Sequence, residues 1–218
     1  MKRGLLVVLV VSMIIISGCS RNDMAKPSAT RTPVITEQPA VETPTPSPAS
    51  KSIEEPLTVG DIVLFGSYEQ DGDENDGAEP LEWLVIDEQD GKLLLLSKYA
   101  IEVMNFAPAH GEGRWVTSPI RDWLNAAFYT DAFTKDEKEY ISQTRHQNFY
   151  RVDMSNGQIR EGKEQYDFGK QLFIDEDTQD YVFLLSEGEA IELSSDVLRC
   201  NPTKHALKNG ADTTSTGF

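Results

Sequence analysis

Residues 81–97 read LEWLVIDEQDGKLLLLS, and the expected architecture of the domain follows from this segment. Its two apolar runs, Leu81 to Asp87 and Lys92 to Ser97, flank the turn signal Gln89-Asp90-Gly91, a pattern typical of a β-hairpin. A third apolar run, Val59 to Phe65, precedes them and has the length of a strand. The sequence therefore predicts that the domain opens with three antiparallel strands.

A helix is predicted after these strands. Ser118 is a suitable N-cap, and Pro119 suits the first helical position. The apolar residues that follow recur at the spacing of one buried helical face: Ile120, Trp123, Leu124, Ala127 and Phe128. We therefore expect this helix to pack on the sheet through that face.

Two capping boxes predict two more short helices. They begin at Thr134 and Ser186, each followed three residues later by Glu, and the helices should end near Ser142 and Leu193. The expected fold class is thus α+β, with antiparallel strands and two or three short helices.

Between the two capping boxes the pattern is weaker. Tyr181 to Leu185 predicts one more strand. The polar stretch from Asn148 to Asp180 shows no clear period, so we expect it to be irregular, with a turn at Ser155-Asn156-Gly157.

The start of the chain predicts export. Lys2 and Arg3 precede an apolar run from Leu5 to Ile16, which ends in the small residues Ser17-Gly18, the layout of a secretory signal. As a helix of ~1.5 Å per residue the run would cover about 18 Å, short of the ~30 Å hydrocarbon core of a bilayer. A transmembrane helix over the uncharged stretch Gly4 to Ser20 stays open as the alternative.

Ile16-Ser17-Gly18-Cys19 resembles a bacterial lipobox. The resemblance implies a lipoprotein signal peptide over residues 1–18 and a mature N-terminus at Cys19 whose thiol carries a diacylglyceryl group. Two or more acyl chains anchor stably because each buried CH₂ contributes ~0.8 kcal/mol. The expected location is the cell membrane, lipid-anchored on its extracytoplasmic side; the alternative is an ordinary thiol behind an ordinary signal.

Residues 19–56 are expected to form a disordered linker behind the lipidated cysteine. Proline recurs there among Thr, Ser, Ala and Glu, and no aromatic residue appears, so the stretch cannot build a core. The folded domain is then expected over residues 57–218.

Composition limits the possible partners. The chain has 36 Asp+Glu against 20 Lys+Arg, a formal net charge of −16, so phosphate backbones repel it and nucleic acid is excluded as a partner. Hydrophobic residues make up 39%, which excludes a polytopic membrane protein. The 2 cysteines predict no disulfide framework.

Six segments occur in a characteristic order: VGDIVLFGSYEQ (59–70), EWLVI (82–86), LLLLSKY (93–99), SPIRDWLN (118–125), VFLLS (182–186) and PTKHA (202–206). Together they resemble the bacterial domain family of unknown function DUF6273, with His205 in place of the family's usual Tyr. The resemblance covers nearly everything from Leu57 onward. More remotely, the family's elements are similar to C-type-lectin-like and formylglycine-enzyme-like α+β domains, a likeness of fold that transfers no catalytic residue.

The resemblance also implies a Trp-rich segment and a closing strand beyond the loop Gly210 to Phe218. We therefore expect a C-terminally truncated member of the family, with a sheet edge left open. Such a domain would be marginally stable or completed by another chain.

Candidate ligand-binding residues are Trp115 and Arg114. Trp115 follows Gly111 and Gly113 in a predicted loop, so it is the best candidate for an exposed aromatic side chain that stacks on a sugar. Trp83 and Trp123 are expected in the core instead. No catalytic residue is predicted, because His110, His146 and His205 lack the spacing of a zinc site.

The loop after residue 70 carries oxygen ligands at the spacing of an EF-hand: Asp71, Asp73, Asn75 and Glu82. Its sixth position is Asp76 where the calcium loop needs Gly, and strands rather than helices flank it. A solvated acidic hairpin tip is favoured over a calcium site.

These observations predict an extracytoplasmic binding or scaffolding module, whose ligand is a glycan or a protein. The alternative is a cell-envelope hydrolase that acts on wall polymers through a pair of carboxyl groups.

Overall fold

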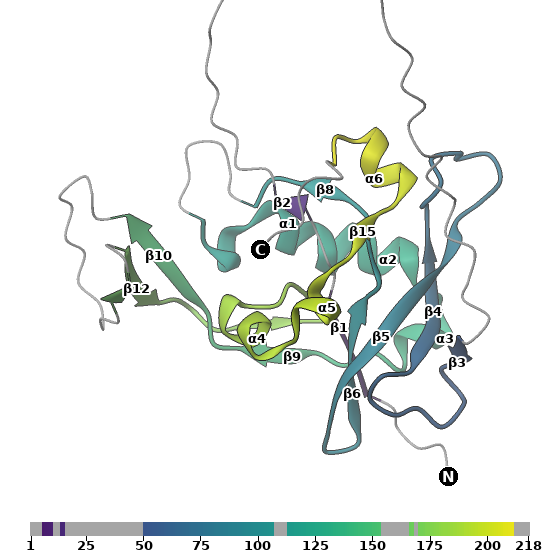
Figure 1. The fold of residues 1–218 in the computed structure, drawn as a ribbon, viewed down its shortest axis with the longest axis horizontal. Coiled ribbons are helices and arrows are strands. Elements are labelled where there is room, and N and C mark those ends of the chain that lie inside the picture. Colours follow the sequence, from purple (N-terminus) through teal and green to yellow (C-terminus); the bar gives the residue numbers. More distant parts are fainter. Residues whose placement is uncertain are drawn as a thin grey trace, which may run out of the picture.

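A six-stranded sheet forms the centre of the molecule in the computed structural model, which describes residues 6–10, 14–15, 50–106, 113–153, 166–167 and 170–211. The strand order is β14-β1-β6-β5-β4-β3, and five of these strands, β1 and β3 to β6, are labelled in Figure 1. The strands span Leu6–Val10 (β1), Lys51–Ser52 (β3), Ile62–Tyr68 (β4), Glu79–Gln89 (β5), Lys92–Ser97 (β6) and Val182–Phe183 (β14).

The predicted antiparallel meander is confirmed by β4, β5 and β6. β4 pairs antiparallel with β5, and β5 with β6. Asp90 and Gly91 join the last two strands with φ of 52° and 73°, and two positive φ values are what a tight two-residue hairpin requires. β4 begins three residues later than expected because Gly60, with φ of 95°, turns the chain just before it.

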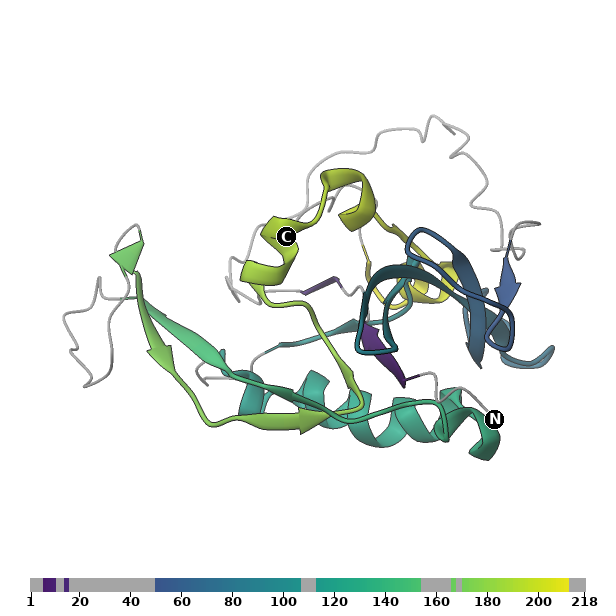
Figure 2. The same ribbon diagram turned by 90° about the horizontal axis from the view of Figure 1, so that it is seen from below.

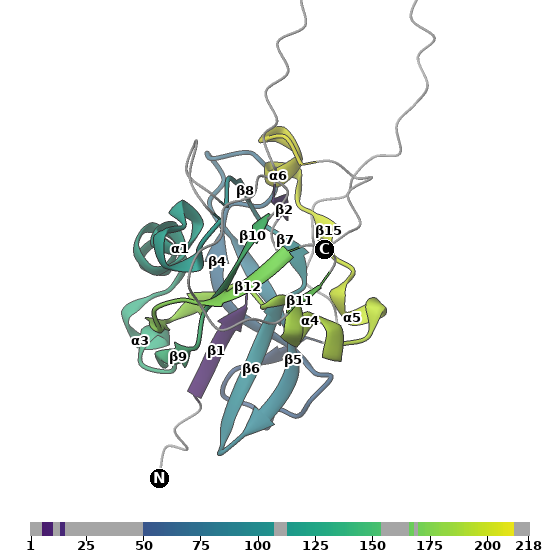
Figure 3. The same cartoon turned by 90° about the vertical axis from the view of Figure 1, so that its left-hand side faces the viewer.

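The N-terminal apolar run contributes a strand that the sequence did not predict. β1 pairs in parallel with β6, from Leu6 opposite Lys92 to Val10 opposite Leu96, and with β14 on its other side (Figures 1 and 3). Further along, β2 (Ile14–Ile15) pairs in parallel with β8 (Val103–Met104). The sheet is therefore antiparallel from β4 to β6 and parallel around β1.

One long helical segment lies along one side of the sheet (Figure 2). It runs through α1 (Pro119–Trp123), a π-helical segment η2 (Leu124–Phe128) and α2 (Tyr129–Ala132). The wider π turn places Ile120, Leu124, Phe128 and Ala132 on the buried face, each four residues after the last. Ala127, expected on that face, is exposed for the same reason.

Both capping boxes are confirmed. Thr134 caps α3 (Lys135–Lys138) and Ser186 caps α4 (Glu187–Glu192). Helix α3 ends four residues before the expected Ser142. Ser118, by contrast, stands before α1 without capping it, because its hydroxyl donates to the Phe106 carbonyl at 2.7 Å.

Three short helical elements were not predicted. They are η1 (Trp115–Thr117), α5 (Ser195–Leu198) and α6 (Lys204–Lys208). The Thr203 hydroxyl caps α6 by accepting from Ala206 N at 3.1 Å.

The expectation of an irregular stretch from Asn148 to Asp180 is corrected. β9 (Thr144–His146) pairs with β13 (Thr178–Asp180), and β10 (Phe149–Asp153) pairs with β12 (Lys170–Ile174). β11 (Tyr166–Asp167) pairs with the other edge of β12. These strands have 2 to 5 residues, too few to show an alternating pattern.

The main core lies between the sheet and the long helical segment. Trp83 is fully buried there, and its indole N–H donates to the Phe65 carbonyl at 2.6 Å; Trp123 packs against the same cluster. A smaller apolar cluster lies around Leu96 and Phe183. The expected core role of Trp83 and Trp123 is confirmed.

The expected linker is described only at its end. Residues 50–56 belong to the fold, because β3 pairs in parallel with β4 and Lys51 bonds Asp61 at 2.7 Å. Cys19, the linker before residue 50, the expected turn at 155–157 and the residues from 212 onward lie outside the described residues. Within the described ranges no helix is long and apolar enough to cross a bilayer.

Candidate binding site

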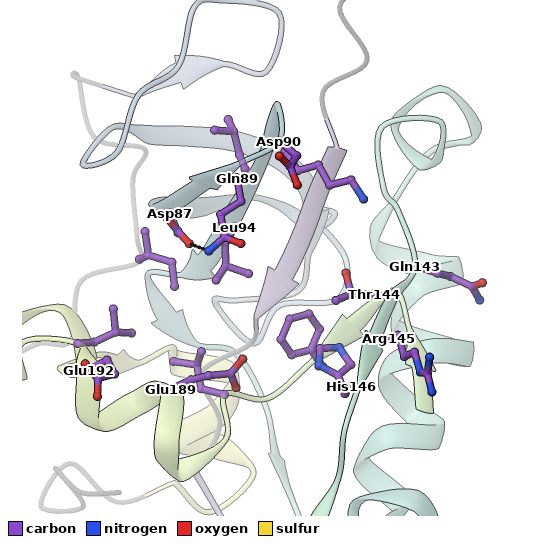
Figure 4. A pocket seen from close by; sticks show the side chains of 16 residues that line it. Asp87, Gln89, Asp90, Leu94, Gln143, Thr144, Arg145, His146, Glu189 and Glu192 are labelled. Carbon is purple, nitrogen blue, oxygen red and sulfur yellow. Dashed lines mark hydrogen bonds between the residues drawn. The ribbon is translucent and has the colours of Figure 1, made fainter. Parts of the chain in front are cut away.

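A cavity of about 630 Å³ lies between the β5–β6 hairpin, β9, β14 and α4 (Figure 4). Its apolar lining comes from Leu93 and Leu94 on β6 and from Phe183 and Leu185 at β14. These positions follow from the sequence, since both segments are continuous apolar runs that a sheet buries on its two faces. The volume lies in the usual range of ligand pockets, roughly 300–1,000 Å³.

The rim of this cavity is charged, with acidic groups in excess. Asp87, Asp90, Glu189 and Glu192 line it against Lys92 and Arg145. Glu189 also caps α4, accepting from Ser186 N at 2.8 Å, and Arg145 donates to Asp177 at 2.9 Å. The rim thus carries four carboxylates, two on the β5–β6 hairpin and two on α4, against two cationic side chains.

His146 forms the wall opposite β6 (Figure 4). Its ring centroid lies 4.0 Å from that of Phe183, and its buried Nε2 has no hydrogen-bond partner among the described residues. Burial lowers the pKa of His146, while the charges of Asp180 and Glu189 act in the opposite direction. The lowered pKa favours the neutral imidazole near pH 7, whose buried Nε2 is a polar atom in this wall.

Arg114 and Trp115 lie elsewhere, and Trp115 is not the exposed aromatic expected from the sequence. Its indole N–H donates to buried Asp180 at 2.9 Å, and its ring stacks on Phe106 at 6.3 Å. Arg114 Nε donates to Asp175 Oδ2 at 2.8 Å, and this hydrogen bond lowers the pKa of Asp175. Both side chains thus hold the domain together, and a ligand-binding role for them stays a prediction.

A buried polar network was missed from the sequence. Asp180, with no exposed surface, accepts from Arg121 Nε at 2.8 Å, from Trp115 and from Thr178 Oγ1 at 2.7 Å. Asn125 accepts from Tyr181 N at 2.7 Å and donates to the Val182 carbonyl at 2.9 Å. Arg121 and Asn125 both stand in the segment SPIRDWLN, so its polar residues were the available signal.

The acidic loop brings together a different set of carboxylates from the EF-hand spacing. Oxygens of Glu69, Asp71, Asp76 and Glu79 lie within 4.8 Å of one another, and exposed acidic groups of this kind are common without an ion. Of the expected ligands only Asp71 belongs to this set.

The other expected ligands are engaged separately. Glu82 is buried on β5 and accepts from Lys98 Nζ and Ser50 Oγ, each at 2.7 Å. Asp73 accepts a hydrogen bond from the Asn75 side chain at 2.8 Å, and the hydrogen bonds from Asn75 lower the pKa of Asp73. A solvated acidic hairpin tip, favoured over a calcium site, stays the prediction for this loop.

The histidines form no shared site among the described residues. His205 Nε2 lies 3.0 Å from Glu102 Oε2, its ring meets Tyr68 edge to face at 6.0 Å, and His146 lines the cavity. His110 lies outside the described residues.

Comparison with known proteins gives one match. Residues 90–215 match the family described as Domain of unknown function (DUF6273), and the strands β4 and β5 that precede the match pair into the same sheet. No curated protein and no solved structure matches. Because the match covers more than half of the sequence, the chain belongs to the DUF6273 family.

Proposed function

We propose that this protein is a lipid-anchored binding or scaffolding module on the extracytoplasmic side of the cell membrane. The anchor is supported by the sequence around Cys19: a basic start, an apolar run of signal length and a lipobox-like Ile16-Ser17-Gly18-Cys19. Membrane lipid, held through Cys19, is then its first partner. After Cys19, the first residue that the structure describes is Ser50, so about 30 residues lie between the anchor and the described domain.

The cavity beside β6 is the observation that carries the binding proposal. It has an apolar lining and a charged rim, the arrangement that fixes a ligand by shape and orients it by a few polar groups. Its aromatic side chain, Phe183, is 3% exposed and offers no open face for a sugar ring. We therefore favour a protein ligand over a glycan.

An envelope hydrolase is the alternative function. A general acid needs a carboxyl group whose pKa is raised by burial or by a neighbouring carboxylate. Four carboxyl groups of the described residues have a lowered pKa, the opposite of what a general acid needs: Asp61, Asp73, Glu137 and Asp175. This favours binding. The remote C-type-lectin-like relation also belongs to the proposal, supported only at the level of an α+β fold class.

Metabolic labelling with a fatty-acid probe tests the anchor. The wild type should be labelled and sediment with membranes, and Cys19→Ala should do neither. Cys200→Ala is the matched control, because it removes the other of the 2 cysteines, and it should behave as the wild type. Equal labelling of Cys19→Ala and wild type would exclude the lipid anchor.

A screen of peptides and glycans against the protein tests the binding role. Leu94→Asp places a charge in the cavity lining and should reduce binding at least about tenfold. Val59→Asp is the control, because Val59 is 58% exposed and outside the lining. Turnover of a wall polymer by the wild type would instead favour the hydrolase.

A further inference from the structure

The strand position between β6 and β14 is a built site. β1 fills it, paired with five residues of β6 and with two of β14, and all these pairings are parallel. β1 reaches this position from the far N-terminus, whereas its two neighbours belong to the DUF6273 match. The sheet therefore contains a position that a separate segment of chain enters.

Both walls of this position are held by other parts of the domain. β6 pairs with β5 from Trp83 opposite Ser97 to Gln89 opposite Lys92. β14 is fixed by Asn125, which bonds Tyr181 N at 2.7 Å and the Val182 carbonyl at 2.9 Å. β1 is the only strand that pairs with β14 among the described residues, so without β1 this segment would be held by Asn125 alone. The edge of β6 would lose its backbone partners, which makes it a template for another strand.

The register sets the chemistry of the occupant. The position opposite Leu95 and Val182 belongs to the main core cluster, and the next position, opposite Leu96 and Phe183, belongs to the smaller one. Successive residues of the inserted strand therefore meet buried walls on opposite faces. The occupant must be apolar at consecutive positions, as a central parallel strand is.

Charge sets its direction. The inserted strand starts opposite Lys92, next to the hairpin tip where Asp87 and Asp90 line the cavity (Figure 4). In this chain Lys2 and Arg3 precede the run Leu-Val-Val-Leu-Val of residues 6–10. We therefore expect a basic residue ahead of an occupant's apolar run to be attracted to Asp90 at the hairpin tip, against the opposing charge of Lys92.

We propose that the position between β6 and β14 is a strand-acceptor site, which in the processed protein takes an extended segment of a partner protein. That segment carries a basic residue followed by about five consecutive apolar residues and pairs in parallel with β6, as in strand-addition complexes. The inference rests on the proposed function, because cleavage before Cys19 removes β1 and opens the site.

The experiment uses the full chain with Cys19→Ser, produced in the cytoplasm so that residues 1–18 stay attached. A protease site inserted within residues 20–49 allows the folded protein to be cut behind β1. After denaturation and refolding, the cut protein is mixed with a labelled synthetic peptide of residues 2–11 followed by two lysines. Binding is measured by fluorescence anisotropy, and hydrogen exchange reports on Leu93 to Leu96 and on Val182 to Phe183.

The peptide should bind in the place of the cut fragment and slow exchange at both walls. A control peptide with Asp at the position of Leu9 should bind at least about tenfold more weakly, because it puts a charged residue at the strand position that pairs with the buried residues Leu95 and Val182. A second control peptide has Ser in place of Lys2 and Arg3. At low salt it should bind at least about threefold more weakly than the original peptide, and at high salt the two should bind with equal affinity.

Three results would overturn the proposal. In the first, the backbone amides of β6 and β14 stay protected from hydrogen exchange although no peptide is bound between them. In the second, the Asp peptide binds as tightly as the original peptide. In the third, the cut protein forms a stable dimer that excludes the peptide. The last result would assign the site to a second copy of this chain. Fatty-acid labelling of Cys19 is measured separately, so a missing lipid anchor and a missing strand site give different results.

Discussion

Removal of the Arg121 guanidinium should destabilise the domain strongly. Asp180 has no exposed surface, and its Oδ1 accepts from Arg121 Nε at 2.8 Å while its Oδ2 is held by Trp115 and Thr178. Arg121→Ala would leave a buried carboxylate without its cationic partner, which costs about 3–5 kcal/mol. Because the Arg121 side chain is 22% exposed, water can reach the vacated place, and we expect about 3 kcal/mol.

Arg145→Ala is the matched control. Arg145 also donates from Nε to an aspartate, at 2.9 Å, but it is 74% exposed and Asp177 is 35% exposed. Exposed ion pairs contribute about 0.2–1 kcal/mol because water and salt screen them. The two variants thus remove the same chemical group and differ in burial.

Urea unfolding of the full chain measures the difference. With an m-value of about 2 kcal/mol/M, Arg121→Ala should lower the midpoint by about 1.5 M and Arg145→Ala by less than about 0.5 M. Arg121→Lys should recover only part of the loss, because Lys lacks the planar fork. Equal midpoints for Arg121→Ala and Arg145→Ala would show that the buried network does not stabilise the strand wall at β14.

Three further predictions follow from single positions. Gly66→Ala should cost about 1–3 kcal/mol more than Gly91→Ala in urea unfolding, because both glycines have positive φ but only at Gly66 would a Cβ lie 2.5 Å from Phe133; equal losses would contradict this clash. Burial lowers the pKa of His146 below its unfolded value of 6.5, so the folded domain is most stable, with respect to this group, above that pH and loses stability as the pH falls from about 7 to 5. His146→Phe should flatten this part of the plot of unfolding free energy against pH, and an unchanged slope would refute the prediction. Millimolar calcium should not raise the melting temperature, because carboxylates of the acidic loop already accept backbone N–H groups, such as Gly72 N at 2.5 Å from Glu69; a rise that Asp71→Asn abolishes would establish a calcium site instead.

Local features were predictable from the sequence because neighbouring residues decide them. The hairpin at Asp90-Gly91 needs only two positive φ values between apolar runs, and both capping boxes close within four residues of Thr134 and Ser186. Where a local rule failed, a distant group competed with it. The Ser118 hydroxyl bonds the Phe106 carbonyl 12 residues away instead of capping α1.

The candidate site depends on contacts between residues far apart in the chain. Asp180 accepts a hydrogen bond from Arg121, which is 59 residues away in the sequence. The same buried carboxylate also accepts from Trp115, 65 residues away, which explains why Trp115 is not the exposed side chain that was expected. No spacing rule covers such distances, because any of the 36 acidic residues could have paired with Arg121. The need to satisfy buried polar groups selects the partner only once the core has closed.

The meander of β4 to β6, the capped helices and the signal-like start could all be predicted from the sequence, because short-range hydrogen bonding and apolar periodicity specify each of them. Only the tertiary structure decided that Leu6–Val10 lies between β6 and β14, that Glu82 turns away from the acidic loop toward Lys98, and that His146 walls a cavity. An apolar run predicts that its residues are buried, either in a membrane or in a sheet. Which of these takes it depends on the unpaired backbone groups that the rest of the fold offers.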